Sequence, residues 1–180
     1  MPYLPWPEET PLPDSYTVLD TETTGLNPEE NQMIEIACIR IQEGVVTDEF
    51  QRLICCQVPL PNVIRELTGI TDEMLAEKGI PFSQALRELL AFLGDDWIVG
   101  HNAEFDITFL LAACKKVGIE APTMKTIDTI QLSRKALGRK VANFRLETLV
   151  GYYQIADKQS HRALSDARLI AQLYDKLNEK

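Results

Sequence analysis

Apolar runs dominate the first third of the chain, and they predict β-strands. Three segments rich in β-branched and aromatic residues, at 16–20, 33–41 and 45–58, are bounded by turn-forming residues. Between the second and the third segment, Glu43 and Gly44 predict a tight hairpin turn. The regular structure therefore starts with strands that follow one another closely along the chain.

Helical spacing of apolar residues takes over in the rest of the chain. Leu164, Ala167, Ala171 and Tyr174, for example, fall on one face of a helix. Helices are predicted at 62–68, 72–78, 81–93, 103–117, 146–153 and 164–177, with short strands at 97–100 and 126–128, the second of which runs into a further helix. Strands followed by alternating helices and strands indicate an α/β protein with a mixed five-stranded sheet flanked by helices.

The first residues differ in composition from everything that follows. Five prolines occur among them, which excludes a regular helix or a central strand there. These are Pro2, Pro5, Pro7, Pro11 and Pro13. We therefore expect an N-terminal arm at 1–14 and one domain at 15–180, because a chain of 180 residues that is 45% apolar supports one substantial core.

Charge and cysteine usage restrict where the protein works and what it binds. The formal net charge is −9 and no block of Lys and Arg is present, so a nucleic acid would be contacted only locally, over a few nucleotides. The four cysteines form no Cys-x-x-Cys pair, which favours a reducing, cytoplasmic location. We expect no signal peptide, and no stretch approaches the roughly 20 apolar residues of a membrane span.

The first candidate for chemistry is the pair Asp20 and Glu22 at the end of the first strand. Residues two apart in a strand point to the same side, so the two carboxylates lie close together. Such carboxylates repel one another unless a cation lies between them, and oxygen ligands favour Mg²⁺ or Mn²⁺. Taken alone, such a pair is more often two solvated surface acids at a strand end.

Two further motifs begin with the only histidines of the chain, His101 and His161. After His101, Asn102 is a candidate N-cap, and Asp106 falls in the first turn of the following helix, where the helix dipole favours a carboxylate. Simple helix capping is the alternative for this motif. Asp166 follows His161 by five residues, and the two share a site if His161 lies in the loop before the helix.

Together these motifs provide four carboxylates and one histidine. A histidine takes up a proton readily near neutral pH, which suits a general base. Paired cations held by carboxylates stabilise the attacking and leaving oxygens of a phosphodiester. The constellation therefore indicates metal-dependent phosphodiester hydrolysis.

These motifs resemble those of the DnaQ-like DEDDh family of 3′–5′ exonucleases, which includes the proofreading subunit of bacterial replicative DNA polymerase. Val18-Leu-Asp-Thr-Glu-Thr-Thr-Gly-Leu26 is similar to the first family motif, His101-Asn-Ala-Glu-Phe-Asp106 to the second and His161-Arg-Ala-Leu-Ser-Asp166 to the third. Smaller matches at 67–74 and 127–129 keep the family order. The resemblance extends over about residues 16 to 175.

The resemblance implies a ribonuclease-H-like fold, two Mg²⁺ or Mn²⁺ ions, and a general base at His161. The implied metal ligands are Asp20, Glu22, Asp106 and Asp166. Thr23 would contact the terminal 3′-hydroxyl, Leu26 would wedge against the terminal base, and His101 and Phe105 would line the nucleotide pocket. The residues expected to bind substrate are Thr23, Thr24, Gly25, Leu26, His101, Asn102 and Phe105.

The implied activity is release of nucleoside 5′-monophosphates from a single-stranded or frayed 3′ end of DNA, in proofreading or repair, with a polymerase or another replication protein as a possible partner. An RNA-trimming enzyme of the same family is an alternative, because no residue indicates how a 2′-hydroxyl would be read. A catalytically silent nucleic-acid-binding module on the same fold is another. It is disfavoured because all five catalytic positions are filled.

Overall fold

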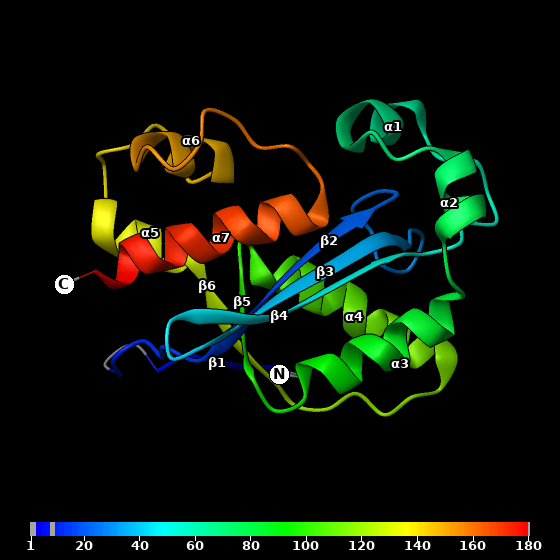
Figure 1. Ribbon diagram of the computed structural model, residues 1–180, viewed down its shortest axis with the longest axis horizontal. Helices are drawn as coiled ribbons and strands as arrows, with labels where there is room; N and C mark the ends of the chain where they lie inside the picture. Colours follow the sequence, from blue (N-terminus) through cyan, green and yellow to red (C-terminus); the bar gives the residue numbers. More distant parts are fainter. Residues whose placement is uncertain (1–2, 8–9, 180) are drawn as a thin grey trace.

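A six-stranded mixed sheet forms the centre of the computed structural model, which describes residues 3–7 and 10–179 (Figure 1). The strands are β1 (Tyr3–Pro5), β2 (Tyr16–Thr23), β3 (Met33–Gln42), β4 (Val45–Leu53), β5 (Trp97–Gly100) and β6 (Met124–Asp128). Their order across the sheet is β1-β6-β5-β2-β3-β4. β1, β6, β5 and β2 pair in parallel, whereas β2, β3 and β4 form an antiparallel meander.

Helices cover both faces of this sheet. The helices of the described residues are α1 (Asn62–Thr68), α2 (Asp72–Lys78), α3 (Phe82–Leu93), α4 (Ala103–Val117), α5 (Thr129–Leu137), α6 (Leu146–Tyr152) and α7 (Ala163–Asn178). α7 crosses one face over β2 and β3 with α5 beside it, while α3 and α4 pack on the other face (Figure 1). Each face buries its own apolar cluster, so alternate residues of the central strands enter different cores.

The predicted α/β architecture is confirmed, but the expected number of five strands is wrong. The sixth strand is β1, in the Pro-rich arm, where Tyr3 pairs with Met124 and Pro5 with Thr126 of β6. Proline is compatible with this position because β1 lies at the edge of the sheet and needs hydrogen bonds on one side only. The arm therefore extends the sheet of the domain that follows it.

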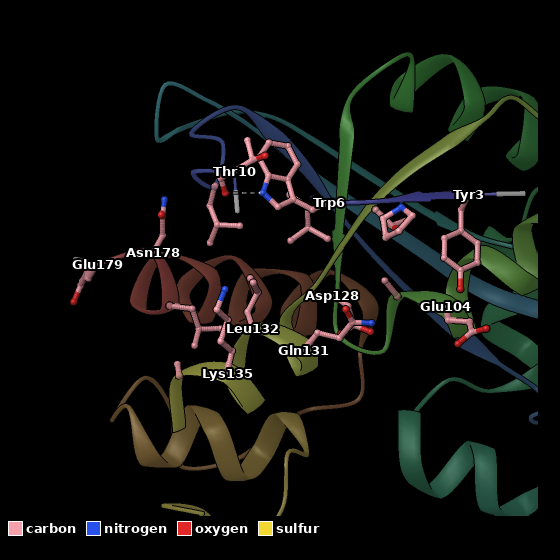
Figure 2. Close-up of a pocket in the computed structure, with 17 residues that line it drawn as sticks. Tyr3, Trp6, Thr10, Glu104, Asp128, Gln131, Leu132, Lys135, Asn178 and Glu179 are labelled. Atoms are coloured by element: carbon pink, nitrogen blue, oxygen red, sulfur yellow. Dashed lines mark hydrogen bonds between the residues drawn. The ribbon is translucent and has the colours of Figure 1, made fainter. Parts of the chain in front are cut away.

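Trp6 holds the arm against the domain. Its ring lies edge-to-face on Trp97 with the centroids 4.5 Å apart, and its Nε1 donates to the Thr10 carbonyl at 3.0 Å. Figure 2 shows the pocket of about 630 Å³ beside the arm, with Trp6, Leu132 and Lys135 among the residues that line it. This pocket contains none of the predicted metal-binding carboxylates.

Several strand boundaries differ from those expected, two of them by three residues or more. β2 continues to Thr23, so Glu22 lies within the strand, and β4 ends at Leu53, whereas the prediction ran to 58. The chain leaves the sheet after Leu53 to reach α1, and Cys55 is consequently exposed. The described cysteines are all free thiols.

The hairpin turn predicted at Glu43 and Gly44 is present. Both residues have positive φ, at 51° and 74°, as a two-residue turn between twisted strands requires. Among the described helices, none is long and apolar enough to cross a membrane.

Candidate active site

The carboxyl ends of β2 and β5 lie side by side in the sheet, and the amino ends of α4 and α7 reach the same edge. β2 and β5 are parallel neighbours, with Thr17 opposite Ile98 and Val18 opposite Val99. α4 begins three residues after the end of β5, and α7 passes over β2 on the opposite face. The strand ends of an open α/β sheet are the usual place for a ligand site.

Three of the predicted metal ligands converge at this edge. Asp20 and Glu22 of β2 and Asp166 of α7 each offer a carboxylate oxygen, and these three oxygens lie within 4.8 Å of one another. Asp20 and Glu22 share the face of β2 that α7 covers, as their spacing predicted. Asp166 reaches them from the first turn of α7.

Asp106, the fourth predicted ligand, lies apart from this group of three oxygens. It is buried in the first turn of α4, and its Oδ1 accepts a 2.7 Å hydrogen bond from Thr21 Oγ1. Thr21 alternates with Asp20 and Glu22, so its hydroxyl faces the α4 side of the sheet. Asp106 is still near enough for its charge to raise the pKa of Asp20. Its role as a metal ligand stays a prediction.

Burial and mutual repulsion make the ionisation of these carboxylates unfavourable. Burial, followed by the charges of neighbouring carboxylates, raises the pKa of Asp20 well above its usual range. Burial and the charge of Asp166 raise the pKa of Glu22 to about 8. Burial raises the pKa of Asp106 to about 7 and also raises that of Asp166, although hydrogen bonds oppose both shifts. A cation among these oxygens would reverse this penalty.

These oxygens fit a divalent cation of the hard, oxygen-binding kind. Close carboxylates that are buried or half-buried and have raised pKa values need either protons or positive charge to share one space. Within the part of the chain that the structure describes, no Lys or Arg hydrogen-bonds to any of the four. An acidic group that could hold a divalent cation is therefore present at this edge of the sheet.

His161 lies in the loop before α7, as its sequence position predicted. The backbone of His161 is left-handed, with φ 53°. The preceding residues fold onto Asp166, which accepts a hydrogen bond from Gln159 Nε2 at 2.6 Å and longer ones from Ser160. His161 is near enough to Asp166 for a positive charge on its ring to lower the pKa of that carboxylate.

Glu35 belongs to the same edge, and the sequence motifs did not single it out. It is fully buried in β3 opposite Glu22, and Arg162 binds it through Nη2 at 2.8 Å and Nε at 3.1 Å. One signal was available in the sequence. The apolar run Met33 to Ile39 predicts burial, and a buried acidic residue needs a partner.

A smaller pocket of about 280 Å³ brings three predicted substrate-binding residues together. Leu26, Asn102 and Phe105 all line it. Leu26 is 84% exposed, an unusual position for a large apolar side chain, and Phe105 stacks on Phe109 with the ring centroids 4.9 Å apart. The pocket therefore offers an apolar wedge and an aromatic wall.

The turn that presents Leu26 is tightly held. Thr23 Oγ1 donates to the Gly25 carbonyl at 2.6 Å, and Thr24 exchanges hydrogen bonds with Gln32 through its amide and its hydroxyl. A Cβ on Gly25 would lie 2.5 Å from Asn31 Oδ1, so a larger residue there would displace the Asn31 side chain. Thr23, Thr24 and Gly25 thus shape the turn, and their contact with substrate stays a prediction.

Asn102 occupies the N-cap position of α4, but the expected side-chain cap is wrong. Its backbone is left-handed, with φ 65°, and its side chain makes no capping hydrogen bond. Asp128, at the end of β6, accepts a 3.1 Å hydrogen bond from the Asn102 amide and a 2.8 Å one from the Ile130 amide. The side chain of Asn102 is consequently free to face the pocket.

His101 does not line the Leu26 pocket. Its Nδ1 lies 2.9 Å from Thr129 Oγ1 and its Nε2 lies 3.0 Å from the Phe144 carbonyl oxygen. Burial lowers the pKa of His101 to about 4, so the ring is neutral at pH 7. A carbonyl only accepts, which places the proton of the neutral ring on Nε2, while the Thr129 hydroxyl donates to the Gly100 carbonyl at 3.1 Å. Its predicted nucleotide contact stays untested.

Comparison with known proteins identifies the family. The family model described as Exonuclease (RNase_T) matches residues 17–174. A DNA polymerase III PolC-type protein of Halalkalibacterium halodurans is 42% identical over 165 residues, which cover 91% of this chain and 11% of that protein. The chain thus spans about a tenth of the length of this curated relative.

Solved structures share the fold at lower identity. Escherichia coli Exonuclease I in complex with a dT13 oligonucleotide matches with a TM-score of 0.79 and 17% identity, over 91% of this chain and 41% of that one. The nuclease domain of 3′hExo, a DEDDh family member bound to rAMP, matches with a TM-score of 0.76 and 21% identity, over 91% and 90%. The chain is a nuclease that belongs to the DnaQ-like exonuclease family.

Proposed function

We propose that the chain is a metal-dependent 3′–5′ exonuclease that acts on DNA and releases nucleoside 5′-monophosphates. The observation that carries this proposal is the convergence of Asp20, Glu22 and Asp166 within 4.8 Å, next to the loop that contains His161. The Leu26 pocket, which Asn102 and Phe105 also line, supports it with room for a terminal base.

In this proposal Asp20, Glu22 and Asp166 hold the cations, and Asp106 completes the set from α4. Two bound divalent cations, Mg²⁺ or Mn²⁺, would lower the pKa of the attacking water and neutralise charge that develops on the phosphoryl oxygens. His161 takes the proton of that water, which a neutral imidazole does near physiological pH. The incoming hydroxyl then displaces the 3′-oxygen of the adjacent nucleotide.

In this proposal, apolar side chains bind the terminal base of the substrate. Phe105 stacks on the terminal base and Leu26 separates it from its neighbour, since both side chains line the same pocket. Every base presents a π-face, so this mode of binding tolerates any sequence. An unpaired end inserts more readily than a paired one, because no base pair has to be opened first.

DNA is the favoured substrate because the relative from Halalkalibacterium halodurans is a DNA polymerase III protein and one structural neighbour holds a dT13 oligonucleotide. The name of the same relative supports a role beside a DNA polymerase, and we propose a cytoplasmic location for that role. A neighbour bound to rAMP gives a specific reason to keep RNA trimming as the second candidate.

The experiment is digestion of 5′-labelled single-stranded DNA and of the matching RNA, with Mg²⁺, with Mn²⁺ and with EDTA. A metal-dependent ladder that shortens from the 3′ end is expected, faster on DNA. Faster digestion of RNA would move the assignment to the second candidate. No cleavage by folded protein with any metal would favour the silent binding module.

A further inference from the structure

Glu35 is a buried carboxylate that the proposed metal site does not use. Its side chain is fully buried, and in the antiparallel register of β2 and β3 it lies directly opposite Glu22. Like charges placed opposite one another across two strands are destabilising. A second acid at this position therefore needs a compensating partner.

Four hydrogen bonds provide that compensation. Arg162 donates from Nη2 to Oε1 at 2.8 Å and from Nε to Oε2 at 3.1 Å, as a two-pronged fork. The Ala163 amide donates to Oε2 at 3.0 Å and Gln51 Nε2 donates to Oε1 at 2.8 Å. Although burial opposes ionisation, these bonds lower the pKa of Glu35 below its usual value, unlike the pKa of the neighbouring acids.

Two of these donors mark the start of α7. Arg162 is the N-cap residue, its side chain makes no capping bond to its own helix, and Ala163 is the first helical residue. The first amides of a helix have no partner within the helix. Glu35 satisfies one of them from β3, and so fixes the start of α7 against the sheet.

The other side of the same loop is held by Asp166. Gln159 and Ser160 both donate hydrogen bonds to its carboxylate. His161 therefore lies between two residues that hydrogen bonds hold in place, Ser160 before it and Arg162 after it. Its backbone has φ 53°, a conformation that persists only where the surroundings enforce it. Within residues 3–7 and 10–179, no hydrogen bond to its imidazole is recorded to hold the ring directly.

We infer that the ion pair of the buried Glu35 with the half-buried Arg162 is a positioning device for His161. The inference rests on the proposed function, because it gives His161 a catalytic role and assigns Glu35 and Arg162 the task of holding its backbone. Neither side chain needs to contact substrate. The pair then controls the rate of the chemical step, with little influence on DNA binding.

Stability alone is a weak reason for such a pair. Removing the Glu35 charge and part of the Arg162 side chain from water offsets much of their attraction, and well-packed apolar residues often replace such ion pairs without loss. A fork that fixes both the direction of Arg162 and the first amide of α7 has geometric consequences that an apolar pair would lack.

The test compares two ways of breaking the pair with a matched control. Glu35→Gln removes the charge and keeps the size, whereas Arg162→Lys keeps the charge and removes the fork. Glu49→Gln is the control, because Glu49 of β4 also binds an arginine of α7 through both oxygens, Arg168, but at an exposed position. Folding is checked by circular dichroism for every variant.

We expect Glu35→Gln and Arg162→Lys to lower kcat on single-stranded DNA by about tenfold or more, the scale of general-base catalysis. KM and the directly measured dissociation constant for Mn²⁺ should stay within about threefold, since the carboxylates of the metal site are untouched. Glu49→Gln should resemble the wild type. Wild-type kcat in folded Glu35→Gln, or an equal loss in Glu49→Gln, would overturn the inference.

His161→Ala provides the decisive background. If the pair acts through His161, adding Glu35→Gln to His161→Ala should lower kcat by less than about twofold, because the positioned group is already gone. A second loss as large as the first would contradict the positioning role, as would a loss of Mn²⁺ affinity parallel to that of kcat. An inactive wild type would instead refute the proposed function, and wild-type activity in His161→Ala would refute the general-base role.

Discussion

Thr21 Oγ1 donates a 2.7 Å hydrogen bond to Asp106 Oδ1, and this bond joins the strand of the carboxylate pair to the helix on the opposite face of the sheet. Both side chains are buried. Asp20 and Glu22 face α7 while Thr21, between them, faces α4. One short segment of β2 therefore contacts both helices that carry predicted ligands.

Replacing Thr21 with Val should destabilise the metal-free protein by about 1–3 kcal/mol. Val keeps the shape of Thr but lacks the hydroxyl, so the buried Asp106 carboxylate loses its hydrogen-bond donor. Urea unfolding in EDTA at about pH 8, where Asp106 is ionised, measures this loss. Thr108→Val is the control, since the exposed Thr108 hydroxyl bonds only within its own helix, to the Glu104 carbonyl. Equal stability of the two variants would contradict this account of Asp106.

Asp20→Asn should lower metal-dependent turnover by about a hundredfold or more while the fold is kept, because the cation loses a ligand on which the other carboxylates depend. Turnover on labelled DNA and Mn²⁺ binding are the measurements. Asp95→Asn, which changes an exposed acid before β5, should leave both unchanged. Full turnover in Asp20→Asn would remove Asp20 from the proposed site.

The pH dependence of stability in EDTA follows from the pKa of Glu22, which is raised from 4.5 to about 8 in the folded protein. The folded state holds this proton more tightly than the unfolded chain does. The resulting stabilisation is complete below pH 4.5 and is lost as the pH rises through about 8. Melting temperatures in EDTA should therefore fall from about pH 5.5 to about pH 8.

The melting temperature of Glu22→Gln should fall less over the same pH range, because the glutamine amide does not titrate. Saturating Mg²⁺ should also reduce the fall in the wild type, since cation binding favours the ionised carboxylate. Parallel curves for the wild type and Glu22→Gln would show that Glu22 is not strained in the metal-free protein.

His101 should prove structural and not titrating in the working range. Its pKa of about 4 keeps the ring neutral from neutral pH upwards. His101→Asn should lower stability by about 1–3 kcal/mol, because the Phe144 carbonyl loses its donor and Thr129 loses one of its two partners. The shape of the pH–rate profile between about pH 6 and pH 8 should be kept, and a flattened profile would assign a catalytic proton to His101.

Leu26→Ala should raise KM for single-stranded DNA about fivefold, because the side chain that wedges against the terminal base is truncated. At 84% exposure, Leu26 contributes little to folding, so the melting temperature should stay unchanged. Val45→Ala, at an exposed apolar position in the β3–β4 hairpin, serves as the control. The same KM in both variants would contradict the predicted contact of Leu26 with substrate.

Much of this fold was predictable because many turns and helix ends depend on the conformational preferences of the residues that form them. Gly118 ends α4 with φ 67°, and the Glu43–Gly44 turn sets the register of β3 and β4. β1 escaped prediction because its pairing depends on β6, more than a hundred residues away, and the prolines around Tyr3 argue against a strand.

The site was predictable to the extent that its geometry follows from spacing. A period of two places Asp20 and Glu22 together, and the position of His161 before a helix follows from the pattern of that helix. The Glu35–Arg162 pair depends on how α7 crosses β3, which no local pattern specifies. The same holds for the bond between Thr21 and Asp106 across the sheet.

The central claim is that this chain removes nucleotides from a 3′ end with divalent metal. Single-turnover digestion of single-stranded DNA labelled at its last 3′ phosphodiester tests it most directly. The account predicts that Mg²⁺ or Mn²⁺ releases a labelled nucleoside 5′-monophosphate as the first product, and that EDTA or Asp20→Asn prevents it. Label appearing first in longer fragments, or release that continues in EDTA, would contradict the account.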